Sequence, residues 1–203
     1  QVRVEMPDFW TVPGTKSIFS FKAHLAYGWY TDAKWQKKFN AGTNNIYTEG
    51  SMFHSKALFI RLGNREAFPL EVIGGLEMAC QFGGTGWNLQ QYGGGALGQG
   101  INLGGNLWTA FLPGGGDVND ENYTNAAGNH VGSWHLRLDW IQKNWSIGLY
   151  MEHMFEDHSQ MFLQYGWKDM LLGLDVNLPD NPFLSTLVYE YNSTMHQSGP
   201  IYH

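Results

Sequence analysis

The sequence has few charged residues, one cysteine and no long apolar run. Charged residues make up 15% of the 203 residues, well below the roughly 25% of ordinary soluble domains. Cys80 is the only cysteine, so an internal disulfide framework and a cysteine-based zinc site are excluded. Its apolar neighbours predict a small buried or lipid-facing side chain. No apolar run approaches the roughly 20 residues of a transmembrane helix, although barrel strands cross a bilayer with about 9–11 alternating residues.

Basic residues are also scarce. The chain has 12 Lys and Arg against 18 Asp and Glu, which gives a formal net charge of -6. Nucleic-acid binding needs a surplus of cations to neutralise phosphates, so a nucleic-acid partner is not expected. No signal peptide is visible in the sequence, and the start at Gln1 suggests a processed or truncated N-terminus.

The sequence is rich in glycine and aromatic residues, and its apolar residues recur at every second position. Glycine numbers 26 and aromatic residues reach 15%. Apolar residues alternate with polar or small ones in seven segments, and hardly any helical period is sustained. Such alternation is typical of strands with one apolar and one polar face. The predicted strands are residues 17–30, 52–62, 70–82, 131–141, 145–155, 170–178 and 183–192.

Short and long connections alternate along the chain. Each short connection is rich in turn residues, and each long one is polar. All short turns therefore lie at one end of the sheet and all long loops at the other, which is the arrangement of outer-membrane barrels. The predicted fold is all-β, a transmembrane antiparallel up-and-down β-barrel formed as a single domain over residues 1–203. Periplasmic turns are expected at 63–68, 142–144 and 179–182, and extracellular loops at 31–51, 83–130 and 156–169.

A soluble sandwich would also show alternating strands, but two features favour the membrane. Aromatic residues stand at the predicted strand ends, as Trp140, Trp145 and Phe183 do near short turns, and barrels carry such aromatic girdles at both lipid–water interfaces. The polar faces also carry full charges such as Glu71 and Arg137, which suit a water-filled lumen. Since closed bacterial barrels usually have an even number of strands, seven strands predict an incomplete barrel with further strands outside this chain.

Four segments resemble the capsule-assembly Wzi family of outer-membrane barrels. They are Leu76–Gly84 (LEMACQFGG), Gly128–Asp139 (GNHVGSWHLRLD), Tyr150–Met161 (YMEHMFEDHSQM) and His196–His203 (HQSGPIYH). The resemblance implies a large barrel in the outer membrane of a Gram-negative bacterium, with its long loops outside. It also implies a lectin that holds capsular polysaccharide at the cell surface, and not an enzyme.

The densest group of chemically versatile side chains follows one predicted strand. It contains Glu152, His153, Glu156, Asp157 and His158, with His130 and His135 on the preceding strand. These residues could form a structural hydrogen-bond network, contact a glycan, or provide metal ligands or paired acids for glycoside cleavage. The spacing from His153 to His158 is not that of helical zinc ligands, so no metal is expected.

Aromatic residues in the predicted loops are the other candidates for glycan contact. Sugar rings stack on aromatic planes, while amides and charged groups bind sugar hydroxyls. Trp108 could instead pack with Phe111 as a loop plug. The candidates are Trp87, Gln91, Tyr92 and Trp108 in the longest loop, and Tyr165, Trp167 and Lys168 in the loop after the acidic group.

The sequence thus predicts an outer-membrane protein that binds surface polysaccharide, with membrane lipid and other outer-membrane proteins as further partners. A passive porin-like channel or a structural subunit of a larger outer-membrane complex is the alternative. A glycosidase using Glu152 and Asp157 is a third hypothesis, which the sequence favours least. The glycines at 93, 95 and 98 match a dinucleotide fingerprint, but no βαβ unit surrounds them, so no cofactor is expected.

Overall fold

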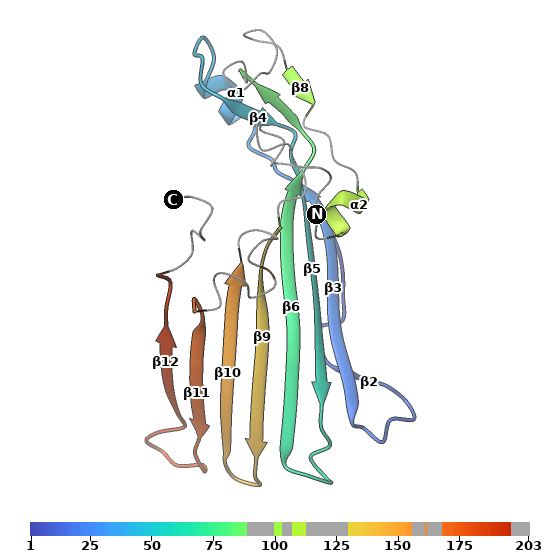
Figure 1. The fold of residues 1–203 in the computed structure, drawn as a ribbon, viewed down its shortest axis with the longest axis vertical. Coiled ribbons are helices and arrows are strands. Elements are labelled where there is room, and N and C mark those ends of the chain that lie inside the picture. The colour runs from blue at the N-terminus through green and yellow to red at the C-terminus, as the bar shows by residue number, and fades with distance from the viewer. Residues whose placement is uncertain (89–99, 103–106, 113–129, 156–160, 162–167, 196–203) are drawn as a thin grey trace. The chain divides into compact units, whose positions relative to one another are not determined.

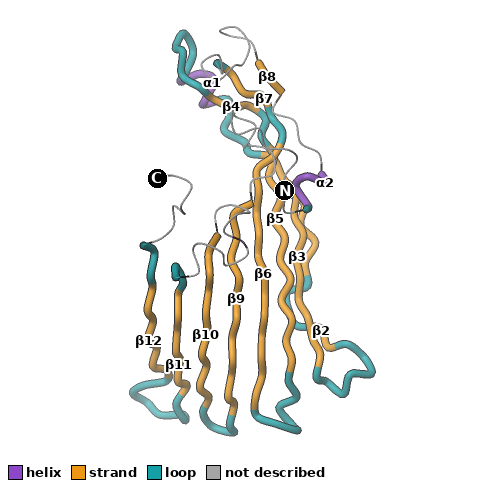
Figure 2. Tube along the Cα trace, in the orientation of Figure 1, coloured by secondary structure: helices purple, strands orange, loops and turns teal. Residues whose placement is uncertain are grey.

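The computed structural model describes residues 1–88, 100–102, 107–112, 130–155, 161 and 168–195. The chain divides into two compact units, and each is described by itself. The first unit comprises Gln1–Val4, Leu25–Lys56 and Ala79–Val131. The second comprises Glu5–His24, Ala57–Met78 and Gly132–His203. The strands of Figures 1 and 2 are interrupted by only two short helices in the described residues.

All seven predicted strands are present. Two of them agree with the predicted ranges residue for residue, and the others differ by one to three residues at an end. The all-β prediction is therefore confirmed at the level of secondary structure. The seven strands are β3 (Phe19–Trp29), β5 (Met52–Leu62), β6 (Leu70–Phe82), β9 (His130–Ile141), β10 (Ser146–Phe155), β11 (Leu171–Asn177) and β12 (Thr186–Asn192).

Seven further elements were not predicted, and all are short. Five of them, three strands and both helices, lie where the sequence predicted long loops only. These elements are β1 (Val2–Glu5), β2 (Trp10–Thr11), α1 (Trp35–Phe39), β4 (Tyr47–Glu49), β7 (Thr85–Trp87), β8 (Gly100–Asn102) and α2 (Leu107–Phe111). None of the described helices is long and apolar enough to cross a membrane.

Nine strands belong to one sheet with the order β1-β3-β5-β6-β9-β10-β11-β12, and β2 pairs with β3 beside β1. Strands β4, β7 and β8 form a separate three-stranded sheet. Within the described residues no strand pairing joins β12 to the other end of the large sheet, so the pairing does not close into a ring.

The second unit holds a regular antiparallel array. Strands β9 to β12 pair in unbroken register (Figure 1), so that Leu138, Leu149 and Leu174 lie side by side on one face. Backbone hydrogen bonds close the connections from β9 to β10 and from β11 to β12. The amide of Gln142 bonds to the carbonyl of Trp145, and that of Leu178 bonds to the carbonyl of Ser185.

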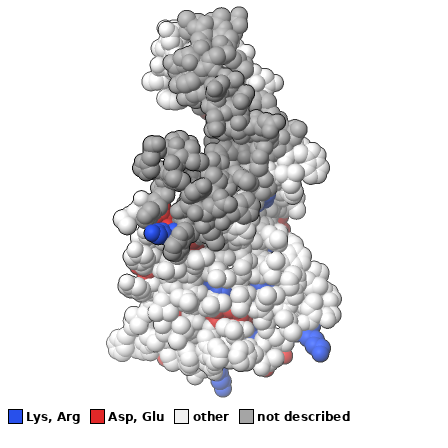
Figure 3. Space-filling model, in the orientation of Figure 1, with Lys and Arg blue, Asp and Glu red and all other residues white. Residues whose placement is uncertain are grey.

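One face of this array, the apolar face, is exposed. Ten of its large apolar side chains are between 36% and 70% exposed, although the register places them against one another in a continuous patch. On the side drawn in Figure 3, charged side chains cover only small areas of the described surface. The ten residues are Leu136, Leu138, Trp140, Ile147, Leu149, Leu172, Leu174, Leu187, Tyr189 and Tyr191.

The opposite face, the polar face, carries buried charges. Asp139 and Asp175 are 9% and 8% exposed, and the guanidinium of Arg137 pairs with both carboxylates at 2.7 Å. On β6 of the same unit, Glu71 is 4% exposed and accepts a 2.7 Å bond from Arg65. Hydrogen bonding to Glu71 raises the pKa of Arg65 above its ordinary value. Along β9 to β12 burial is thus inverted relative to a soluble protein, where apolar side chains are inside and charges outside. Elsewhere in the same unit, Met78, Phe155 and Met161 form a buried apolar cluster.

The first unit packs α2 against strand residues. Ala110 of α2 is fully buried in a small apolar cluster with Cys80 and Phe82, and Tyr27 and Met52 pack around it. The buried position predicted for Cys80 is confirmed. This cluster holds α2 on the face of β3 that also carries Leu25, since alternate residues of a strand share a face.

Candidate functional site

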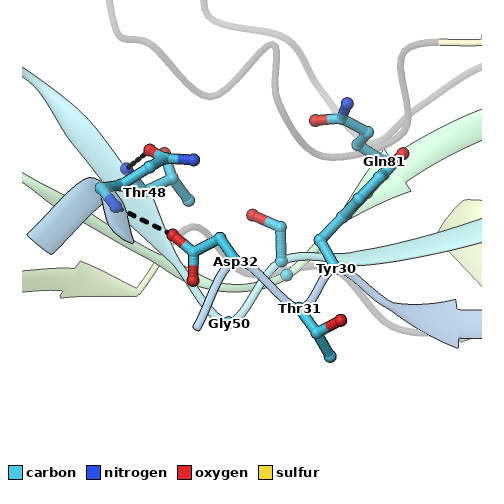
Figure 4. Close-up of a pocket in the computed structure, with 9 residues that line it drawn as sticks. Tyr30, Thr31, Asp32, Thr48, Gly50 and Gln81 are labelled. Atoms are coloured by element: carbon cyan, nitrogen blue, oxygen red, sulfur yellow. Dashed lines mark hydrogen bonds between the residues drawn. The ribbon is translucent and has the colours of Figure 1, made fainter. Parts of the chain in front are cut away.

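A polar pocket lies in the first unit, where the segment after β3, the start of α1 and the turn after β4 meet the end of β6. Its volume is about 380 Å³, within the range of about 300–1,000 Å³ typical of small-molecule sites. Figure 4 shows Asp32 between Thr48 and Tyr30, with Gln81 near the Tyr30 ring. The residues that line the pocket are Tyr30, Thr31, Asp32, Gln36, Thr48, Gly50, Ser51, Gln81 and Gly83.

Asp32 is fixed by the chain that follows it. Its carboxylate accepts hydrogen bonds from the backbone amides of Lys34 at 2.8 Å and Gln36 at 3.0 Å. These bonds lower the pKa of Asp32 below its ordinary value, and the bond from the Gln36 amide has the largest effect. They also hold Ala33 and Lys34 in the left-handed region, with φ of 51° and 61°, which is unfavourable for residues with a Cβ. The pocket therefore presents an ionised, oriented carboxylate.

The other walls are joined by backbone and side-chain hydrogen bonds. The Gln36 side-chain oxygen accepts a 3.3 Å bond from the amide of Thr48, which links α1 to β4. The amide of Tyr30 bonds to the carbonyl of Ser51 at 3.0 Å. Gly84, next to the pocket, has a φ of 93°, and a Cβ there would stand within 3.0 Å of Glu49 and Ser51 backbone atoms. Glycine alone tolerates both this positive φ and the close backbone contact, and it allows β4 and β7 to approach each other.

An aromatic and charged group stands on the neighbouring three-stranded sheet. Trp87 and Tyr47 are register partners, and their rings stack at 6.2 Å with an angle of 8°. The Lys37 ammonium lies 5.5 Å from the Trp87 ring and 3.4 Å from the Glu49 carboxylate. The indole Nε1 of Trp87 is buried and has no hydrogen-bond partner among the described residues. These contacts hold β4, β7 and α1 together beside the pocket.

The described lining of the pocket combines hydrogen-bonding groups with one apolar plane. Hydroxyl and amide side chains supply donors and acceptors, and the half-exposed ring of Tyr30 supplies an apolar plane. Asp32 is the only acid among the described lining residues, whereas the usual mechanisms of glycoside hydrolysis use two carboxyl groups. The described lining therefore suits non-covalent recognition.

Two of the residues predicted for glycan contact come together around α2 instead. His130 is 2% exposed, and its Nε2 lies 2.9 Å from the carbonyl oxygen of Ala110 and 3.2 Å from Lys56 Nζ. Trp108 packs edge-on against Phe111 with the ring centroids 6.1 Å apart, the packing predicted for a loop plug. Lys56 donates hydrogen bonds to the carbonyl oxygens of Ala110, at 3.3 Å, and Phe111. The structure gives these residues the role of an anchor for α2.

The predicted acidic and histidine group is divided between the two faces of β10. Glu152 lies on the polar face, 3.4 Å from His135 on β9. His153 is fully buried, and its Nδ1 lies 2.8 Å from the carbonyl oxygen of Asp169. Lys168 is exposed, and Trp87 lies in β7 outside the pocket lining. The other predicted residues lie outside the described residues: Gln91, Tyr92, Glu156, Asp157, His158, Tyr165 and Trp167.

The pocket residues themselves were not predicted. Most fall within or next to the range 31–51, which the sequence showed only as a polar loop, and Gln81 lies in an alternating strand. One local signal was present, since the acidic residue Asp32 stands two residues before Lys34, the N-cap of the short helix α1. Within the described ranges no three His, Cys, Asp or Glu side chains come together as metal ligands. Comparisons with protein families, curated proteins and solved structures find no match to this chain.

Proposed function

We propose that this chain is part of an outer-membrane β-barrel that binds surface polysaccharide non-covalently through the pocket around Asp32. The observation that carries the binding proposal is the pocket lining, in which one oriented carboxylate, two amides and several hydroxyls surround an exposed tyrosine. Sugars present both hydroxyl groups and apolar C–H faces, and this lining offers partners for both. Capsular or another surface polysaccharide is the proposed ligand, as the resemblance to the capsule-assembly Wzi family implies.

The proposed location rests on the inverted burial along β9 to β12. Ten neighbouring large apolar side chains are exposed, while Asp139 and Asp175 are buried. In water such a continuous apolar patch would promote aggregation or association. In a bilayer the same face would contact lipid, and the polar face would line the interior, as in barrels whose strands alternate apolar-out and polar-in. Further strands, from this protein or another outer-membrane protein, would complete the barrel.

The binding proposal is tested by titrating the purified protein in detergent micelles with capsular polysaccharide from its source cell. We expect saturable binding, and a loss of tenfold or more in affinity for Tyr30→Ala, which removes the exposed ring of the pocket. Tyr189→Ala is the matched control, because it removes the same atoms from the apolar face of β12. Equal affinities for the Tyr30 variant and the wild type would overturn the role of the pocket, and absence of binding by a folded protein would overturn the function.

A second candidate function is a passive channel, which the charged polar face of β9 to β12 favours. Arg137, Asp139 and Asp175 lie together on this face, and charged side chains suit a water-filled pore. Conductance measured across a planar bilayer separates the two functions. Steady conductance without glycan binding supports the channel, whereas glycan binding without conductance supports the polysaccharide-binding protein.

A further inference from the structure

We infer that the Asp32 pocket selects uncharged sugar units and discriminates against acidic ones such as uronates. This inference rests on the proposed function, because it names the class of sugar that the same pocket takes. It depends on the balance of charge among the described lining residues, and on the hydrogen bonds that fix Asp32, the one charged side chain among them.

The described part of the lining carries a single charge. Asp32 is acidic, and the other described lining residues are Tyr30, Thr31, Gln36, Thr48, Gly50, Ser51, Gln81 and Gly83, none of which is basic. A carboxylate ligand in a protein site is usually matched by Arg or Lys, above all by the planar guanidinium. A uronate in this pocket would instead meet neutral dipoles and a like charge.

The negative charge of Asp32 is fixed over the ordinary pH range. Two backbone amides donate to its oxygens and lower its pKa, so protonation does not relieve the repulsion of an acidic sugar at neutral pH. An ionised carboxylate has about four acceptor positions. The two backbone bonds leave others free, which can accept hydrogen bonds from the hydroxyls of a neutral sugar.

Three described lysines lie on or beside α1, namely Lys34, Lys37 and Lys38, and none of them is among the described lining residues. Lys37 lies on α1, but its ammonium is 3.4 Å from the Glu49 carboxylate and lies over the Trp87 ring. It is therefore held toward the three-stranded sheet and is not among the lining residues. Neutralising an acidic sugar with Lys37 would require breaking both of these contacts.

The test uses the purified protein in detergent micelles and a panel of immobilised oligosaccharides. The panel contains neutral hexose oligomers, N-acetylhexosamine oligomers, oligouronates and the methyl esters of the same oligouronates. The ester pair is the decisive comparison, because esterification removes the charge and keeps the ring and its hydroxyls. We expect each ester to bind at least tenfold more tightly than its acid, which corresponds to about 1.4 kcal/mol. The preference should weaken as salt is raised, because salt screens exposed charges.

A charge-reversal variant links the preference to this pocket. Gln81→Lys places an ammonium in the lining, so the preference for the ester should shrink or reverse. Gln81→Met removes the amide without adding charge and should keep the preference. If oligouronates bind the wild type as tightly as their esters, the inference is overturned while the proposed function stands. Absence of binding to every glycan of the panel overturns the proposed function itself.

Discussion

The ring of Tyr150 on β10 lies directly over Gly173, its register partner on β11. A Cβ on Gly173 would overlap the ring. The tyrosine reaches across this glycine, and its hydroxyl donates a 2.5 Å hydrogen bond to Glu190 on β12. In the same manner, the Arg137 side chain extends over Gly148 and pairs with Asp175. Glycines on the polar face thus make room for long polar side chains that connect strands two apart.

Gly173→Ala should destabilise the protein by about 1–3 kcal/mol, because the new methyl group displaces the Tyr150 ring and weakens its bond to Glu190. The measurement is equilibrium unfolding by urea in detergent micelles. Gly74→Ala is the matched control, since a Cβ at Gly74 would meet no atom within 4 Å, and it should change the unfolding free energy by no more than about 0.5 kcal/mol. Equal stabilities of the two variants would contradict the steric role of Gly173.

Arg137→Met should cost about 3–5 kcal/mol of stability, because it leaves the buried carboxylates of Asp139 and Asp175 without their cation. Lys143→Met removes one positive charge from an exposed turn and is expected to have little effect. Thermal unfolding of both variants in the same detergent makes the comparison. The triple variant with Asp139→Asn and Asp175→Asn should regain part of the loss. A triple variant less stable than Arg137→Met alone would show that the charges are not the cause.

Lys56→Met should loosen α2 from the strands, because Lys56 donates to the carbonyl oxygens of Ala110 and Phe111. Hydrogen bonds to charged groups contribute about 1.5–3 kcal/mol each, so amide exchange over residues 107–112 should accelerate at least tenfold. Hydrogen–deuterium exchange followed by mass spectrometry measures this directly. The exposed Lys38 provides the control variant, Lys38→Met. Unchanged protection of α2 in the Lys56 variant would refute the anchoring role.

Asp32 should titrate below its unfolded value of about 3.9, since two backbone amides stabilise its ionised form and lower its pKa. Because the folded-state pKa is depressed, the stability that these two hydrogen bonds contribute is fully present above the unfolded pKa. It is lost as the pH falls through the folded pKa. Carboxyl chemical shifts measured by NMR from pH 6 to pH 2 test the direction. A midpoint at or above the unfolded value would contradict the bonding of Asp32, and Asp32→Asn should speed amide exchange in α1 at pH 7.

The strands of the large sheet could be predicted because their signal is local. In β5 and β6 the alternation of apolar and polar residues runs for 11 and 13 residues, and both predicted ranges agree with the structure. The residues that share each face of a strand could also be predicted, because alternate residues of a strand point to the same side of the sheet. The short elements β4, β7 and α1 have three to five residues, too few for a period to be recognised.

The pocket could not be predicted, because its residues meet only through tertiary pairing. Asp32, Thr48 and Gln81 are far apart in sequence, and the pairing of β4 with β7 brings their segments together. Sequence reasoning instead favoured aromatic and histidine residues for their chemistry alone. His153 shows the weakness of that criterion, since it is fully buried and its ring lies against the Asp169 carbonyl.

The proposed membrane location is tested most directly by asking whether the apolar face of β9 to β12 contacts lipid. Spin labels are placed one at a time at Leu149 on the apolar face and at Glu152 on the polar face, after the sole cysteine is removed as Cys80→Ser. Collision with lipid-soluble oxygen and with a water-soluble nickel chelate is then measured by electron paramagnetic resonance in bilayers. If the apolar face contacts lipid, the label at Leu149 should collide with oxygen and be shielded from nickel, and the label at Glu152 should show the reverse. A label at Leu149 that is freely accessible to nickel would contradict the proposed membrane location.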